Sequence, residues 1–191
     1  AALAVHERAG YVGPGSEGVG ASLVEEEKLG LVAAARRLSP GRFLLVGTGM
    51  ESTRGTAALT RKAADLGADA VLVLTPHFYK GRMSADALRL HFEAVANASP
   101  VPVYLYSVPA FTGLPWPPGL APALAAHPRV AGMKESSGDV GLLGRVVASV
   151  PSSPTAVVTP ERVSDDNATG GTRVCAPPSP PPPVRWTCRS T

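Results

Sequence analysis

The sequence is short of cysteine, of charge and of long apolar runs, and each shortage excludes a class of protein. Its 191 residues include only two cysteines, Cys175 and Cys188, whose spacing fits neither a disulfide framework nor a zinc or redox motif. The net charge of +3 comes without a basic block. No apolar run approaches the ~20 residues of a membrane span. We therefore expect one domain whose partners are neither nucleic acid nor a membrane.

Histidine is also scarce, and the one dinucleotide-like motif lacks its context. The four histidines are scattered along the chain, so no metal cluster is visible. Residues 13–18 fit G-x-G-x-x-G, but no helix follows at once. The first acidic residue after the next predicted strand is Glu51, far too distant for a ribose contact. We therefore expect no metal and no nicotinamide cofactor.

Proline divides the chain into a body, 1–150, and a tail, 151–191. The tail holds 9 of the 20 prolines and, from Pro160 onward, shows no apolar periodicity. Such a segment cannot offset its ordering entropy, which predicts disorder. Its string 180–185 fits P-x-x-P-x-R, so a peptide ligand for SH3-type grooves is one alternative for the tail.

The body alternates strand patterns with helix patterns. Its continuous apolar runs suit parallel strands covered on both faces, and they lie at 43–47, 70–74, 101–106 and 130–133. Helical spacing fills 23–38, 52–66, 85–98 and 140–150. A first strand before Gly15 brings the count to five strand–helix units. With a further possible strand at 155–159, they predict either a doubly wound sheet or a (β/α)8 barrel. A complete barrel needs about 250 residues, so only part of one fits.

Lys134 is the most informative residue of the body. The chain has four lysines, and Lys134 alone ends an apolar run, 130–133. Lysine is almost never buried without a reason, and an apolar site favours the neutral amine that forms Schiff bases. The alternative is a lysine at a strand end that snorkels to solvent. Tyr106 ends the preceding strand, where it is either a proton-transfer group or a packing residue.

Several stretches together resemble the dihydrodipicolinate synthase / N-acetylneuraminate lyase family. The carrying motifs cover about residues 10–150, and they are Gly15-Ser16-Glu17-Gly18, 47–53, 81–84, 106–113 and Gly132-Met133-Lys134-Glu135-Ser136. The pair Tyr-x-Val-Pro-x-x-Thr-Gly and Gly-Met-Lys-x-Ser on successive strands is the specific signal.

The resemblance implies a (β/α)8 barrel and a class I aldolase that needs no cofactor. Lys134 matches the Schiff-base lysine, and Tyr106 matches the tyrosine that relays protons. Ser16 and Glu17 match the residues that hold the keto-acid carboxylate. Ser136 matches a serine that contacts the substrate. The implied reaction cleaves 4-hydroxy-2-oxoglutarate, a small oxo-acid, to glyoxylate and pyruvate in mitochondria.

The chain also departs from the family pattern. Phe78 stands where the family has a relay tyrosine, so the relay role falls to its neighbour, Tyr79. Phe111 replaces a polar or basic residue used for substrate recognition. The family's first strand, its last strands and its C-terminal helices are unmatched, so we expect a barrel truncated at both ends, with a tail unrelated to the family. A catalytically inactive product and a related pyruvate lyase or synthase are the alternatives, and a family-like tetramer is the expected assembly of a complete barrel.

Overall fold

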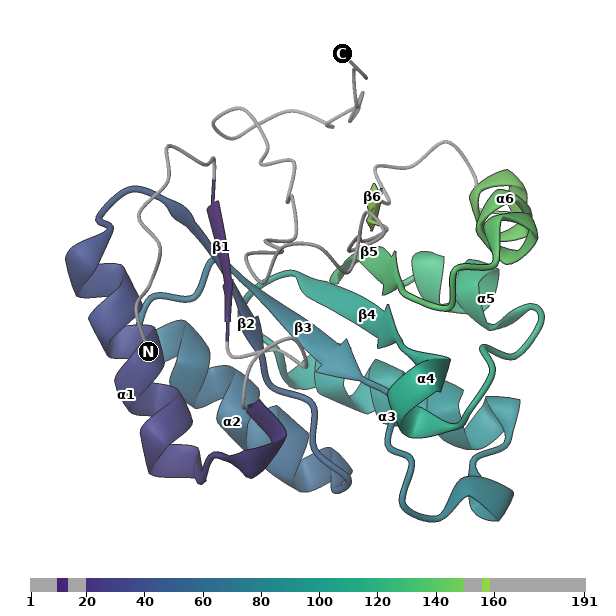
Figure 1. Cartoon of the computed structure of the whole chain (residues 1–191), viewed down its shortest axis with the longest axis horizontal. Helices are drawn as coiled ribbons and strands as arrows, with labels where there is room; N and C mark the ends of the chain where they lie inside the picture. Colours follow the sequence, from purple (N-terminus) through teal and green to yellow (C-terminus); the bar gives the residue numbers. More distant parts are fainter. Residues whose placement is uncertain (1–9, 14–19, 150–155, 159–191) are drawn as a thin grey trace, which may run out of the picture.

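The computed structural model describes residues 10–13, 20–149 and 156–158, which form one parallel sheet and the helices around it (Figure 1). The strands run in chain order as β1 (Gly10–Gly13), β2 (Phe43–Gly47), β3 (Ala70–Leu74), β4 (Val103–Ser107), β5 (Val130–Glu135) and β6 (Ala156–Val158). The helices are α1 (Glu25–Leu38), α2 (Thr53–Asp65), α3 (Ala85–Ala98), α4 (Pro109–Thr112), α5 (Leu120–Ala125) and α6 (Val140–Ser149), with short 3-10 turns η1 (Gly20–Ser22) and η2 (Lys80–Arg82).

The order of the strands decides between the two predicted architectures. The sheet is 6-stranded, every pairing is parallel, and each strand lies beside its neighbours in sequence, from β1 to β6. A doubly wound sheet reverses its strand order at a switch point, and no reversal occurs among the described strands. Right-handed crossovers that always step in one direction place every helix on the same face. The fold is therefore a partial (β/α)8 barrel.

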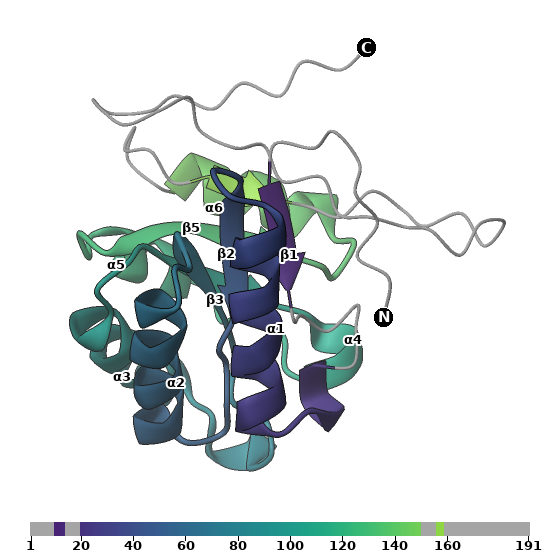
Figure 2. The ribbon, with the colours of Figure 1, turned by 90° about the vertical axis from the view of Figure 1, so that its left-hand side faces the viewer.

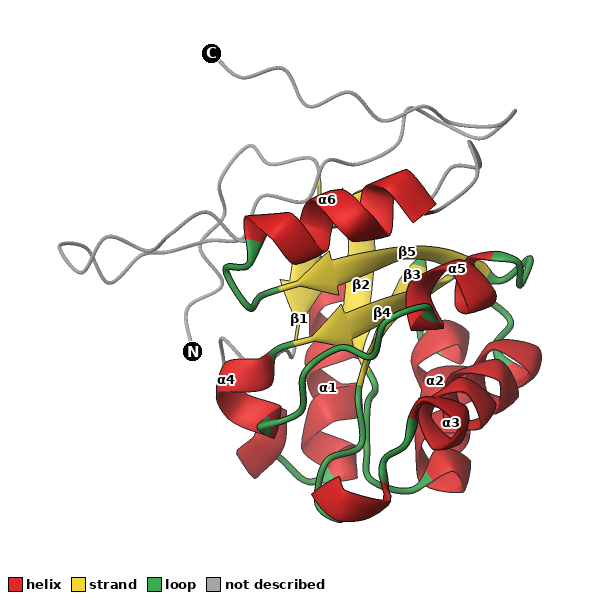
Figure 3. Ribbon diagram, turned by 90° about the vertical axis from the view of Figure 1, so that its right-hand side faces the viewer, coloured by secondary structure: helices red, strands yellow, loops and turns green. Residues whose placement is uncertain are grey.

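The figures show this one-sided covering. The helices α1, α2 and α3 lie side by side on one face of the sheet (Figure 2). On the same face, α6 lies along β5 and packs against α5 (Figure 3). The opposite, inner face is thus the one that a closed barrel encloses, and α4 lies where β4 leaves the sheet.

Apolar clusters fill both faces of the sheet, two of them on the helix side and one on the inner side. On the helix side, Val73 and Leu105 pack against Phe92 of α3 and Leu124 of α5. On the inner side, a smaller cluster consists of strand residues and the residue after β4: Leu45, Ala70, Leu72, Tyr106 and Val108. Side chains alternate along a strand, so a buried parallel strand contributes apolar side chains to both faces of the sheet. This explains why the strands read as continuous apolar runs.

Capping residues and a glycine in the sequence predicted where several helices begin or end. The predicted N-cap Ser84 accepts a hydrogen bond from the amide of Ala87, and Asp139 accepts one from Leu142 at the start of α6. Gly67 follows α2 with φ of +96°, a left-handed conformation that glycine adopts without strain. The strand predicted at 155–159 is confirmed as β6, which pairs with β5.

Four elements differ from the sequence prediction, two in their bounds and two because they were not predicted. β4 begins at Val103, because Pro102 lacks an amide hydrogen for the ladder. β5 continues through Lys134 and Glu135, beyond its apolar run. The helices α4 and α5 were not predicted, because prolines between residues 109 and 122 interrupt any helical spacing of apolar residues. The predicted domain boundary near 150 stays a prediction, since residues 159–191 lie outside the described part.

Candidate active site

The site is built on β5, which carries Lys134 on the inner face of the sheet. The side chain is buried, with the residue 3% exposed, although it lies one residue from the end of the strand. The pairing register explains its direction. Val103 pairs with Val130, but Tyr104 pairs with Gly132, so β5 has one extra residue at this point. Because side chains alternate along a strand, this bulge turns Lys134 from the helix side to the inner side.

Tyr106 is the neighbour of Lys134 across the sheet. The two residues are paired in the β4–β5 register. The Lys134 Nζ lies 4.5 Å from the centroid of the Tyr106 ring, and the tyrosine is only 4% exposed. The structure therefore brings together, on adjacent strands, the two residues that the sequence predicts as nucleophile and proton relay. An ammonium over an aromatic face is a favourable contact.

A second tyrosine lies on the same face of β4. Tyr104 is half-buried and packs against the inner cluster. Burial raises the pKa of its phenol above the ordinary value of 10.0, because the charged form loses hydration. Tyr104 therefore stays protonated at neutral pH, and its hydroxyl can donate or accept a hydrogen bond on this face.

Two buried hydroxyls lie at the carboxyl ends of the strands. The Ser136 amide donates to the Ser107 carbonyl at 2.9 Å, and the Thr75 amide donates to the Tyr106 carbonyl at 3.3 Å. The side-chain oxygens of Ser136 and Thr75 are both buried and have no hydrogen-bond partner within the described part of the chain. The predicted contact between Ser136 and a substrate stays a prediction.

Glu135 is a buried carboxylate that the sequence analysis did not consider. It is 2% exposed and lies between the predicted lysine and serine. Glutamate is as rarely buried as lysine, so the same reasoning that singled out Lys134 also applied to its neighbour. The apolar run 130–133 stops before Glu135, so the hydrophobic pattern alone does not predict its burial.

Tyr79 lies apart from this buried group, in the loop after β3. It is 68% exposed and packs edge to face against Phe78, with ring centroids 5.0 Å apart. The loop is held by Glu51, whose carboxylate accepts hydrogen bonds from the amides of His77 and Phe78 at 2.9 and 2.8 Å. The relay role of Tyr79 stays a prediction. The predicted carboxylate-binding residues, Ser16 and Glu17, lie outside the described residues.

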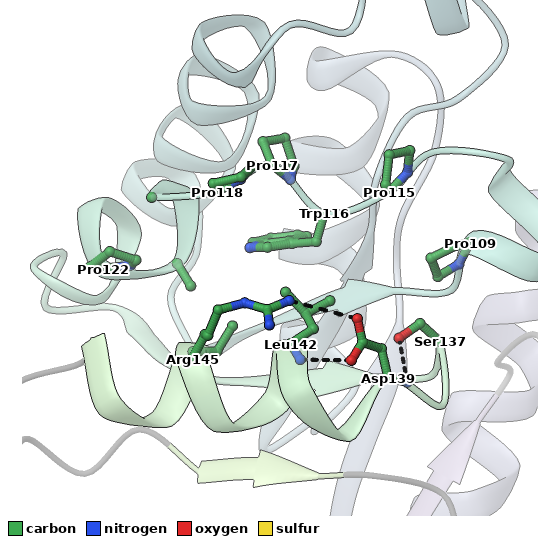
Figure 4. A pocket seen from close by; sticks show the side chains of 13 residues that line it. Pro109, Pro115, Trp116, Pro117, Pro118, Pro122, Ser137, Asp139, Leu142 and Arg145 are labelled. Atoms are coloured by element: carbon green, nitrogen blue, oxygen red, sulfur yellow. Dashed lines mark hydrogen bonds and ion pairs between the residues drawn. The ribbon is translucent and has the colours of Figure 1, made fainter.

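A cavity of about 500 Å³ lies outside the Lys134 face, between α6 and the segment that leads into α5 (Figure 4). Its wall is rich in proline, with Trp116 between the prolines and Arg145. Its remaining lining includes Ser137 and Asp139, which follow β5. Neither Lys134 nor Tyr106 lines this cavity, so it is separate from the lysine site.

The described residues carry neither a metal cluster nor a helix able to span a membrane. Among them, no group of three or more histidine, cysteine, aspartate or glutamate side chains could hold a metal ion. No described helix is both long enough and apolar enough to cross a membrane. His91 is buried, and its Nδ1 lies 2.8 Å from the Thr53 hydroxyl at the start of α2. It belongs to the contact between α2 and α3, not to the lysine site.

Known proteins share this sequence and this fold. Residues 8–159 match the model of the Dihydrodipicolinate synthetase family. A probable mitochondrial 4-hydroxy-2-oxoglutarate aldolase from Emericella nidulans is 42% identical over 146 residues, which are 73% of this chain and 47% of that protein. A 4-hydroxy-tetrahydrodipicolinate synthase from Exiguobacterium sibiricum is 40% identical over 150 residues, 78% of this chain and 50% of the relative.

Solved structures of this family have a similar fold over most of the chain. A dihydrodipicolinate synthase from Bacillus anthracis superposes with a TM-score of 0.75 at 26% identity, covering 80% of this chain and 52% of that one. The chloride-inhibited enzyme from Acinetobacter baumannii, solved with pyruvate, has a TM-score of 0.69 at 32% identity, covering 78% and 50%. The chain spans about half the length of these relatives. With the family model matched over most of its length, the chain belongs to the dihydrodipicolinate synthetase family.

Proposed function

We propose that this barrel is a class I, Schiff-base lyase that cleaves an oxo-acid and releases pyruvate. One observation carries the proposal: Lys134 is buried at the carboxyl end of β5, with its Nζ 4.5 Å from the centre of the Tyr106 ring. In barrels of this kind, the active site lies at the carboxyl ends of the strands. A buried amine next to a phenol supplies the nucleophile and the proton carrier that an imine mechanism needs.

The mechanism begins when the neutral Lys134 amine adds to the keto carbon of the substrate and water leaves. The protonated imine then draws electrons from the next carbon–carbon bond but one, which joins the carbon beside the imine to the carbon that bears the substrate's hydroxyl group. That bond breaks while Tyr106 relays the proton of the substrate's hydroxyl group, which becomes the aldehyde of the first product. The electron pair left behind forms an enamine, which takes up a proton at carbon. Water hydrolyses the resulting imine, and this step releases pyruvate and restores Lys134.

We propose 4-hydroxy-2-oxoglutarate as the substrate, with glyoxylate as the aldehyde product. The support is the relative named as a probable mitochondrial 4-hydroxy-2-oxoglutarate aldolase, at 42% identity. The unpartnered Ser136 hydroxyl would donate to a substrate oxygen, and Ser16 and Glu17 are proposed to lie near the keto-acid carboxylate. No cofactor takes part in this reaction scheme. The name of that relative is also the basis for proposing a mitochondrial location.

A related synthase is the second candidate, because several relatives carry the name 4-hydroxy-tetrahydrodipicolinate synthase. One solved relative contains pyruvate. Both candidates would form the same pyruvate imine on Lys134, so they differ only in the second reactant. Incubation with 4-hydroxy-2-oxoglutarate, followed by assay of glyoxylate, separates them. Glyoxylate release supports the aldolase, whereas condensation of pyruvate with an aldehyde other than glyoxylate supports the synthase.

An inactive product is the third candidate. The described sheet ends in β1 and β6, whose outer edges have no strand partner in the described part. Open edges expose unpaired backbone groups and favour aggregation. A broad unfolding transition together with no glyoxylate release would support this candidate, whereas a sharp transition with release would exclude it.

A homo-oligomer is the proposed assembly, as the family resemblance implies. The exposed pair Phe78 and Tyr79, at 74% and 68% exposure, supplies apolar surface at the rim of the site. One solved relative is described as a monomeric variant, so assembly varies among the relatives. Sedimentation velocity tests the proposal, since a species of one chain mass at micromolar concentration would contradict it.

A further inference from the structure

Tyr106 and Lys134 form one pair across the sheet. The next residue along each strand belongs to a second pair, on the other face of the sheet. Ser107 pairs with Glu135, one step beyond Tyr106 and Lys134. Because side chains alternate, Ser107 and Glu135 point to the helix side when their neighbours point inward. Both are buried, with 1% and 2% exposure. The mechanism proposed above uses neither residue.

The Glu135 carboxylate accepts hydrogen bonds from β4 and from the residues that follow β5. The Ser137 amide donates to its two oxygens at 2.9 and 3.1 Å, and the Ser137 hydroxyl donates at 2.8 Å. From β4, the Ser107 hydroxyl lies 3.4 Å from Oε1. A buried carboxylate is costly unless donors surround it, so these hydrogen bonds keep the local backbone in one arrangement.

The same contacts extend to the start of α6 (Figure 4). The Ser137 hydroxyl accepts a hydrogen bond from the Asp139 amide at 3.0 Å, and Asp139 caps α6 through the Leu142 amide at 2.9 Å. On the other side, the Ser136 amide is bound to the Ser107 carbonyl. Glu135 is thus the centre of a network that fixes the chain where it leaves β5. Lys134 and Ser136 are its immediate neighbours.

We propose that Glu135, together with Ser107 and Ser137, is a positioning group that holds Lys134 against Tyr106 and directs the Ser136 hydroxyl into the site. The inference rests on the proposed Schiff-base function. Catalytic geometry is sensitive to small displacements, and an error of about 1 Å can cost ~10²-fold in rate. Loosening the network should therefore slow imine formation, while the binding of pyruvate changes little.

The test measures borohydride trapping of pyruvate on the full chain, as a rate constant at saturating pyruvate and as the pyruvate concentration for half-maximal rate. Ser137→Ala removes the exposed hydroxyl that binds Glu135, and Ser137→Thr keeps it. We expect the saturating rate of Ser137→Ala to fall by about tenfold with an unchanged half-maximal concentration. Ser137→Thr should restore most of the rate. Glu135→Gln, which keeps the shape but not the charge, should fall further.

The control is Ser99→Ala, which removes a serine contact away from the site, a hydrogen bond of 2.6 Å to the Val101 carbonyl before β4. It should lower the melting temperature without changing the trapping rate. Equal saturating rates for wild type, Ser137→Ala and Ser137→Thr would overturn the positioning inference and leave the proposed function intact. Wild-type chain that traps no pyruvate on Lys134 would overturn both.

Discussion

Two regions at the carboxyl ends of the strands hold their predicted site residues in different ways. At the β4–β5 edge, Lys134 and Tyr106 are buried, paired in register and backed by hydrogen bonds to Glu135. In the loop after β3, Tyr79 is exposed, and the backbone is held by local hydrogen bonds, among them those that the Glu51 carboxylate accepts from the loop. The sheet therefore determines the geometry of the first region, and local loop contacts determine that of the second.

The two regions suit different tasks: the buried strand ends suit the chemical step, and the exposed loop suits contact with a substrate or a partner. A nucleophile must be desolvated and fixed, which the ladder of a parallel sheet provides. Loops tolerate exposure and motion, and they commonly contact substrates or partner subunits. We expect substitutions in the β4–β5 region to change the rate of chemistry and substitutions near the β3 loop to change stability or local order.

The largest effect is expected from Lys134→Met, which keeps much of the side-chain volume but removes the amine. Without the nucleophile no imine forms, so glyoxylate release should fall by at least about 10³-fold. A coupled assay of glyoxylate measures it, with Lys28→Met on α1 as the matched control. Retention of more than a tenth of the activity in Lys134→Met would show that another residue forms the imine.

Tyr106→Phe should come next, because it removes only the phenolic oxygen. The ring that lies against Lys134 is kept, so the fold and the burial of the lysine should persist. Loss of a proton-transfer group typically costs 10²–10⁴-fold, and we expect cleavage to fall within about that range. Tyr104→Phe is the control on the same face of β4 and should change the rate less than about threefold. Equal losses of cleavage rate in the two variants would contradict the role of Tyr106 as the proton relay.

On the other side of the comparison, acid should weaken the α2–α3 contact beside the β3 loop. Burial lowers the pKa of His91 from 6.5 to about 4, and the charge of Glu51 opposes the shift only in part. The folded state thus favours neutral His91, so its stabilisation is complete above pH 6.5 and is lost as the pH falls toward 4. The full loss is about 3 kcal/mol.

Urea unfolding at pH 7.0 and at about pH 4.5 tests this expectation against the variant His91→Phe, which cannot titrate. Other carboxylates titrate in both proteins, so the informative quantity is the difference between their pH dependences. Parallel curves for the two proteins would contradict the assignment to His91.

The smallest effect is expected from Glu51→Gln, which weakens the hold on the β3 loop without removing the side chain. The amide has one acceptor oxygen in place of two, and hydrogen bonds to a charged acceptor are the stronger ones. We expect the amides of His77 and Phe78 to exchange with deuterium about tenfold faster. Glu93→Gln, which breaks the pair with Arg89 on α3, is the control. Unchanged exchange in Glu51→Gln would show that the loop has another support.

Most of the strands and helices could be predicted from the sequence, because a parallel strand that is buried on both faces appears as a continuous apolar run. The bounds of β2 and β3 match their apolar runs, and Lys134 and Tyr106 lie side by side as expected from successive strands. The sequence could not predict the extra residue in β5 that turns Lys134 inward, since a bulge depends on the pairing register. The contact of Glu51 with the His77 amide joins two loops, and periodicity carries no information on such contacts.

The measurement that tests the central claim most directly is reduction with borohydride in the presence of pyruvate, followed by peptide mass spectrometry. The account predicts a pyruvyl adduct on the peptide that contains Lys134, which would be absent without pyruvate and absent in Lys134→Met. Soluble, folded chain with no adduct, or with an adduct on another lysine, would contradict it.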